Sequence, residues 1–208
     1  MDRPPTVKVK EDWASHSLQY RVATSLARFF ATVLHRGVLV EGLENLPRSG
    51  RVILASNHSS VLDPPIIGMS VSRLRFPHYL AKRELLRPEP FGMILRSWGT
   101  IPVDRGRGDT GAIRAVLRLL ESEGCMVIFP EGTRQKPGRV SRAKPGVGYL
   151  AKASGAPVVP LRVRNTELLF GMDPFRVTLG RSMMFGGDGE RESYQEFADR
   201  VLQAIYAL

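Results

Sequence analysis

The residues of this chain best suited to chemistry lie in the short stretch 57–63 (NHSSVLD). An aspartate that holds one ring nitrogen of a histidine fixes the tautomer of the ring and stabilises the imidazolium, so the other nitrogen can act as a general base near neutral pH. In a continuous helix His58 and Asp63 would point about 140° away from each other, because each residue turns the helix by about 100°. The pair can therefore meet only if a loop separates the two residues.

The surrounding sequence indicates a strand, a loop and a helix start. Residues 52–55 form an apolar run typical of a buried strand, so His58 would emerge at a strand end, where α/β folds tend to bind ligands. Asp63 followed by Pro64 and Pro65 is the signature of a helix start, with Asp63 as the N-cap. A tight loop would return the carboxylate to the imidazole. The alternative is that Asp63 only caps the helix and His58 is a polar loop residue.

Two further polar clusters follow apolar, strand-like runs, at residues 104–107 and 131–134. If the strands are neighbours, these clusters converge with residues 57–63 at one edge of a sheet. The planar fork of arginine suits phosphate oxygens, and a glycine in the turn after a strand lets backbone N–H groups approach an anion. A general base beside arginines and backbone N–H groups that bind phosphate predicts an enzyme that activates a hydroxyl on a phosphorylated substrate. Each arginine taken alone is more simply a surface charge.

Other chemistries lack their usual sequence features. The chain has no Gly-x-Ser-x-Gly elbow and no Gly-x-x-x-x-Gly-Lys loop. Its four histidines lie far apart, and Cys125 is the single cysteine, so no metal-ligand spacing and no intramolecular disulfide is expected. The sequence therefore favours metal-free acid–base chemistry.

The pattern of apolar runs predicts a single α/β domain. Of the 208 residues, 43% are apolar and 24% charged, which is an ordinary globular composition. We expect a mixed, mostly parallel sheet with helices on both faces and an N-terminal amphipathic helix. Strands are predicted at 38–41, 52–56, 78–82, 101–103, 126–129, 157–163 and 177–179, and helices at 14–35, 63–70, 88–97, 109–124, 146–154 and from 192 onward.

The N-terminal region carries a second kind of signal. Residues 1–12 are predicted to be a mobile tail, and the helix after it has an apolar stripe that includes Leu18, Val22 and Phe29. This stripe either packs on the core or lies in a bilayer interface. The start lacks a secretory signal, and no stretch reaches about 18 consecutive apolar residues, so we expect a cytoplasmic protein that can lie on a membrane.

The net charge of +10 is concentrated in one segment, because residues 131–181 contain ten basic and three acidic side chains. Such a segment attracts anionic membranes, phosphate-bearing substrates, acidic carrier proteins or nucleic acid. Nucleic acid ranks last, because the basic stretch 134–144 contains no aromatic residue to stack on bases.

Four blocks of the sequence, in order, resemble the glycerolipid acyltransferases, and specifically the 1-acylglycerol-3-phosphate acyltransferases. The blocks are residues 57–63 (NHSSVLD), 99–105 (GTIPVDR), 129–134 (FPEGTR) and 158–161 (VVPL). One block alone would be a weak signal, whereas four at suitable spacing are specific. The resemblance covers about residues 38–165, and it divides the chain into residues 1–36, the tail and helix, and residues 37–208, the acyltransferase domain.

The resemblance implies roles for individual residues. His58 would be the general base and Asp63 its orienting partner. The positions implied for substrate binding are Arg105, Glu131, Gly132 and Arg134 at the phosphate and glycerol of the acceptor, Thr133 beside them, and Pro160 on the acyl-donor side.

The resemblance also implies the reaction. An acyl group would pass from acyl-CoA or acyl carrier protein to the free hydroxyl of 1-acylglycerol-3-phosphate, giving phosphatidic acid in phospholipid biosynthesis, with no cofactor. The enzyme would act as a peripheral protein on the cytoplasmic face of a membrane. Two alternatives stay open: another lysolipid or glycerol-3-phosphate as acceptor, and a non-catalytic lipid- or phosphate-binding protein.

Overall fold

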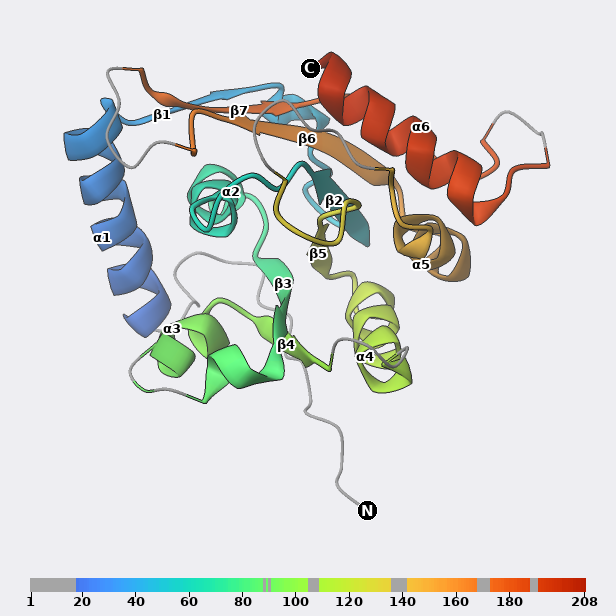
Figure 1. Cartoon of the computed structure of the whole chain (residues 1–208), viewed down its shortest axis with the longest axis horizontal. Coiled ribbons are helices and arrows are strands. Elements are labelled where there is room, and N and C mark those ends of the chain that lie inside the picture. The colour runs from blue at the N-terminus through green and yellow to red at the C-terminus, as the bar shows by residue number, and fades with distance from the viewer. Residues whose placement is uncertain are drawn as a thin grey trace.

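A seven-stranded sheet forms the centre of the molecule (Figure 1). The computed structural model describes residues 18–87, 89, 91–104, 109–135, 142–167, 173–187 and 191–208. The strands are β1 (Val38–Glu41), β2 (Val52–Ser56), β3 (Pro77–Lys82), β4 (Thr100–Val103), β5 (Cys125–Ile128), β6 (Val158–Arg164) and β7 (Phe175–Leu179). They lie in the order β1-β7-β6-β2-β5-β3-β4, and only β6 and β7 run antiparallel.

The central strand β2 determines where the first polar cluster lies. It pairs in parallel with β5 on one side and β6 on the other, with Ala55 opposite Ile128 and Pro160. All five residues of β2 are buried, as expected for a parallel strand covered on both faces. Because β2, β5, β3 and β4 are parallel, the segments that follow them leave the sheet at the same edge.

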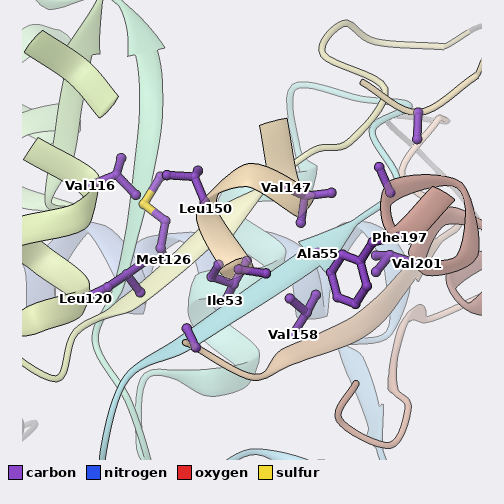
Figure 2. Close-up of a cluster of buried hydrophobic side chains, with 14 of the residues drawn as sticks. Ile53, Ala55, Val116, Leu120, Met126, Val147, Leu150, Val158, Phe197 and Val201 are labelled. Atoms are coloured by element: carbon purple, nitrogen blue, oxygen red, sulfur yellow. The ribbon is translucent and has the colours of Figure 1, made fainter. Parts of the chain in front are cut away.

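Helices cover both faces of the sheet and bury two separate apolar clusters. The helices are α1 (Leu18–His35), α2 (Asp63–Val71), α3 (Phe91–Ser97), α4 (Thr110–Glu121), α5 (Gly146–Ser154) and α6 (Tyr194–Ala207), with 3-10 helices η2 (Leu43–Asn45) and η3 (Arg83–Leu86). Ile53 and Ala55 face α4, α5 and α6 (Figure 2). Val52 and Leu54 face the other way, toward the cluster that includes α2. This alternation follows from the period of two along a strand.

The observed elements confirm the predicted fold class. Each predicted strand and helix is present in the described residues with shifts of a few positions, whereas η2 and η3 were not predicted. The start of α2 differs in a way that matters for chemistry. Leu62 occupies the N-cap position without a side-chain capping bond, and the helix begins at Asp63. The prediction that Asp63 caps the helix is therefore wrong.

The described side chains of the predicted apolar stripe on helix α1 face outward. Tyr20, Thr24 and Ala31 are buried, whereas Leu18 is 73% and Phe29 62% exposed. Of the two predicted placements, packing of the stripe on the core is thus wrong for these residues. No helix in the described part of the chain is both long and apolar enough to cross a membrane.

Phe197 on α6 provides a test of the packing between helix and sheet. Its side chain is fully buried in the cluster with Ala55 and Val158 (Figure 2). We expect Phe197→Ala to lower the free energy of unfolding by about 3–5 kcal/mol, because it leaves a cavity in the core. Urea denaturation measures this loss. Phe91→Ala, which removes an exposed ring on α3, is the control and should change stability by less than about 1 kcal/mol. Equal losses in the two variants would contradict the packing described.

Candidate active site

Asn57 anchors the loop that carries His58. Its side-chain amide donates to the carbonyl of Val163 at 2.9 Å, and its Oδ1 accepts the N–H of Val163 at 2.8 Å. Asn57 thereby extends the pairing of β2 with β6 by one residue, using a side chain in place of backbone. This satisfies buried backbone groups where the two strands end and fixes the direction in which the chain leaves β2.

The imidazole of His58 and the carboxylate of Asp63 are hydrogen-bonded, as the sequence predicted. Nδ1 of His58 lies 2.8 Å from Oδ2 of Asp63. The same oxygen accepts the backbone N–H groups of Ser59 and Ser60, each at 2.8 Å. Asp63 therefore directs its carboxylate back onto the preceding loop, which explains why it does not cap α2. Its side chain is 0% exposed, so these bonds compensate the cost of burying it.

Thr166 completes the surroundings of Asp63 and was not predicted from the sequence. Its hydroxyl donates to Oδ1 of Asp63 at 2.6 Å, and the contact spans 103 positions of the chain. Thr166 is buried and follows β6, the parallel neighbour of β2. A polar residue just after a neighbouring strand is a signal that could have suggested it, but only with the strand order known.

The ring and the backbone of His58 are both held in place. The ring stacks on Phe129, with centroids 4.1 Å apart and planes inclined by 21°. The N–H of His58 donates to Oε2 of Glu131 at 2.8 Å, and its carbonyl accepts the N–H of Gln135 at 2.7 Å. No hydrogen-bonding partner for Nε2 occurs among the described residues, and the side chain is 17% exposed. Nε2 is thus the nitrogen free to take a proton from a bound molecule.

Glu131 lies beside the backbone of His58, whose N–H it accepts. It is 2% exposed, and its Oε1 accepts the hydroxyl of Tyr206 at 2.6 Å. Burial raises the pKa of Glu131, and the hydrogen bonds from Tyr206 and from the His58 amide oppose that rise. Both carboxylate oxygens therefore have partners within the protein. The role of Tyr206 had not been predicted.

The remaining residues predicted for substrate binding lie in different surroundings. Gly132 has a φ of 73° in the turn after β5, a conformation that favours glycine. Thr133 and Arg134, which follow it, are exposed at the same edge of the sheet. Pro160 is buried within β6, with its carbonyl accepting the N–H of Gly180 at 2.8 Å. Arg105 lies outside the described residues.

The second polar cluster is described only at its first residue, Asp104. Arg83 binds the carboxylate of Asp104 through Nε and Nη2, both at 2.9 Å to their nearer oxygen. The cluster follows β4, which lies three strands from β2 in the sheet. At about 4.8 Å per strand this is roughly 14 Å. Residues 57–63 and 131–134 thus follow neighbouring strands, as the predicted convergence requires, whereas β4 is not a neighbour of β2 and residues 105–107 lie outside the described residues, so convergence of the second cluster stays a prediction.

The single cysteine is buried, and no cluster of metal-ligating side chains occurs among the described residues. Cys125 is fully buried in β5, and this burial raises the pKa of its thiol to about 12, so the reactive thiolate is absent at neutral pH. Within the same residues, no group of three or more His, Cys, Asp or Glu side chains could hold a metal ion.

A histidine hydrogen-bonded to a buried carboxylate, at the carboxyl edge of a mostly parallel sheet, is an arrangement suited to acid–base chemistry. Residues 37–164 match the family model described as Acyltransferase. The chain belongs to this acyltransferase family.

Several relatives carry one enzyme name, 1-acyl-sn-glycerol-3-phosphate acyltransferase. The Bacillus subtilis (strain 168) protein is 32% identical over 127 residues, which are 61% of this chain and 62% of the relative. The Borreliella burgdorferi protein is 31% identical over 136 residues, covering 64% and 53%. The human alpha protein is 31% identical over 147 residues, covering 69% and 51%. The matched region thus spans less than two thirds of each of these relatives.

The fold also has a counterpart among solved structures. The crystal structure of the 1-acyl-sn-glycerophosphate (LPA) acyltransferase PlsC from Thermotoga maritima superposes with a TM-score of 0.67 at 22% identity. The match covers 91% of this chain and 82% of that chain. It confirms the predicted α/β fold.

Thr166→Val tests the support of Asp63 without changing the shape of the side chain. The variant leaves Oδ1 of a buried carboxylate without its donor, so we expect the free energy of unfolding to fall by about 1–3 kcal/mol. Urea denaturation near neutral pH measures the loss. Thr178→Val is the matched control, because the Thr178 hydroxyl makes an exposed bond of 3.4 Å to Glu41. If both variants lost the same stability, the Thr166 hydroxyl would have no special role.

Proposed function

We propose that this protein transfers an acyl group from an acyl thioester to the free hydroxyl of 1-acylglycerol-3-phosphate, giving phosphatidic acid in phospholipid biosynthesis. The observation that carries the proposal is the His58–Asp63 hydrogen bond of 2.8 Å, with Nε2 directed away from it. The shared name of the relatives supports the choice of acceptor.

The reaction follows from the properties of this pair. Nε2 of His58 removes the proton from the acceptor hydroxyl as the oxygen attacks the thioester carbonyl carbon. A C–O bond forms, the carbonyl becomes a tetrahedral oxyanion, and its collapse breaks the C–S bond. The thiolate then takes the proton from the imidazolium. The acyl group passes directly between substrates, so no acyl-enzyme is required.

Asp63 contributes by holding the ring during this step. Its bond to Nδ1 fixes the tautomer in which Nε2 is unprotonated and ready to accept, and it stabilises the imidazolium that forms. Because the carboxylate itself is held by Ser59, Ser60 and Thr166, it need not move when the ring becomes charged. Such preorganisation lowers the cost of reaching the transition state.

The acceptor's phosphate and glycerol are assigned to residues beside this base. Arg134 and Thr133 are exposed at the end of β5, next to the His58 loop, and Arg105 would add a second guanidinium. Gly132 allows the tight turn that carries them. Glu131 holds the backbone of the loop that carries His58, and Pro160, within β6, shapes the part of the site that receives the acyl donor.

For the donor we propose acyl-CoA or an acidic acyl carrier protein, because both carry negative charge that suits the basic segment 131–181. No cofactor is required.

Peripheral binding to the cytoplasmic face of an anionic membrane fits the outer surface of α1. Leu18, Val22 and Phe29 are exposed on this helix, and α1 packs beside α2 and α3 (Figure 1). Helix α3 and the preceding η3 add further exposed apolar side chains, namely Leu85, Phe91, Met93 and Ile94. An apolar helix face of this kind can insert at the boundary between head groups and acyl chains.

The reaction is tested by thioester consumption with purified protein. We expect release of free thiol from acyl-CoA or acyl carrier protein to depend on 1-acylglycerol-3-phosphate, and His58→Ala to lower turnover by about 10²- to 10⁴-fold through loss of the general base. Circular dichroism controls for folding. Near wild-type turnover of His58→Ala would refute the mechanism, and faster turnover with glycerol-3-phosphate or another lysolipid would reassign the acceptor. Lipid binding without thioester consumption by any donor would indicate a non-catalytic protein.

Membrane binding is tested by co-sedimentation with phosphatidylglycerol vesicles. The double variant Val22→Asp with Phe29→Asp places charges on the apolar face of α1, so we expect the bound fraction to fall by at least about tenfold. Binding of the wild type should also weaken as salt increases. The control is Met184→Asp, which charges an exposed apolar side chain far from α1 in the sequence. Unchanged binding of the double variant would exclude α1 as the contact.

A further inference from the structure

The last turn of α6 reaches the loop after β2 that carries His58. Tyr206 lies in this last turn, and its hydroxyl donates to Oε1 of Glu131 at 2.6 Å across 75 positions of the chain. Glu131 in turn accepts the backbone N–H of His58 on its other oxygen at 2.8 Å. A single buried carboxylate therefore connects the end of α6 with the backbone of His58.

The connection is held from the sheet side as well. Nη1 of Arg162 on β6 donates to the carbonyl of Tyr206 at 2.5 Å, and its guanidinium lies over the Tyr206 ring, 4.6 Å from the centroid. Arg164 donates to the carbonyl of Leu208. Two arginines of one strand thus fix the final turn of α6 and give the Tyr206 ring a defined position from which its hydroxyl points at Glu131.

The electrostatics of Glu131 explain why a second donor matters there. Burial opposes ionisation of this carboxyl, and the Tyr206 hydroxyl and the His58 amide are the hydrogen bonds that counter it. Burial and the bond to Glu131 both raise the pKa of Tyr206, so its hydroxyl keeps its proton and remains a donor. Without that donor, Oε1 would be buried with an unmet hydrogen bond, and the carboxylate would gain from moving away from the His58 amide.

We propose that Tyr206 is a positioning residue for the acyl-transfer reaction: its hydroxyl holds Glu131 in the conformation that fixes the backbone of His58, and so aligns Nε2 with the acceptor hydroxyl. The effect on turnover rests on the proposed function, whereas the chain of hydrogen bonds does not. Misalignment of a general base affects the chemical step more than ground-state binding, so the loss belongs to kcat.

The test is Tyr206→Phe, which keeps the ring and removes the hydroxyl. We expect kcat to fall about tenfold, with the KM values for acyl-CoA and 1-acylglycerol-3-phosphate within about twofold of the wild type. In ¹⁵N-labelled full-length protein, the amide hydrogen of His58 should exchange about tenfold faster, because its acceptor is less well held. Tyr194→Phe is the matched control: it makes the same change at the exposed first residue of α6 and should alter neither measurement.

Glu131→Gln shows whether Tyr206 acts through the carboxylate. Within this background, Tyr206→Phe should lower kcat by less than about twofold further, because residues that act as a unit are not additive. A tenfold additional loss of kcat in this background would overturn the route through Glu131. A lower kcat of Tyr206→Phe alone, with unchanged hydrogen exchange at the His58 amide, would overturn it as well. Wild-type values for Tyr206→Phe in both measurements would overturn the proposal outright.

A wrong proposed function would give a result that differs from a wrong role of Tyr206. In that case the wild type itself would show no acceptor-dependent thiol release with any donor. The His58 amide exchange of Tyr206→Phe and Tyr194→Phe would still decide whether Tyr206 holds the loop, since it requires no substrate.

Discussion

The structure of the site depends on one buried carboxylate. Asp63 has no exposed side-chain surface, so its charge would be costly without donors around it. The imidazole of His58, two loop amides and the Thr166 hydroxyl supply them. These donors come from the loop after β2 and from the segment after β6. The need to satisfy Asp63 therefore determines the loop conformation and joins two neighbouring strand ends.

The parallel sheet lets these strand ends meet through short segments. Adjacent parallel strands end at the same edge, so short segments after β2, β5 and β6 reach one another without long loops. The backbone of His58 is bonded to Glu131 and Gln135 after β5, and its side chain to Asp63 at the start of α2. A histidine held at both backbone and ring would lose little freedom when a substrate binds, which suits His58 to the proposed role of general base.

Local sequence patterns predicted the strands and the α-helices, whereas for His58 and Asp63 they left a hydrogen-bonded pair and a simple helix cap as alternatives, and the family resemblance favoured the pair. Apolar runs such as β2 and β5 determine strands wherever both faces are covered, and the spacing of His58 and Asp63 required the loop that is observed. The cap assigned to Asp63 failed because one pattern, Asp-Pro, suits both a helix start and a carboxylate turned toward the preceding amides. Thr166 and Tyr206 were missed for another reason. Their contacts span 103 and 75 positions, and local spacing carries no information on which distant segments adjoin.

The orientation of α1 is the part of the fold that core packing explains least. A helix placed for core burial alone would turn Leu18, Val22 and Phe29 inward, since each apolar side chain removed from water contributes about 1.5–3 kcal/mol. Instead Tyr20 and Thr24 are buried, and Leu18, Val22 and Phe29 face out. The stabilisation forgone in water is recovered only if another apolar medium covers the stripe. Helix α1 packs on α2, whose first residue is Asp63, so that medium would lie on a neighbour of the site. Under the proposed function, in which the acceptor is a lipid, docking of this helix on a bilayer would also bring His58 toward its substrate.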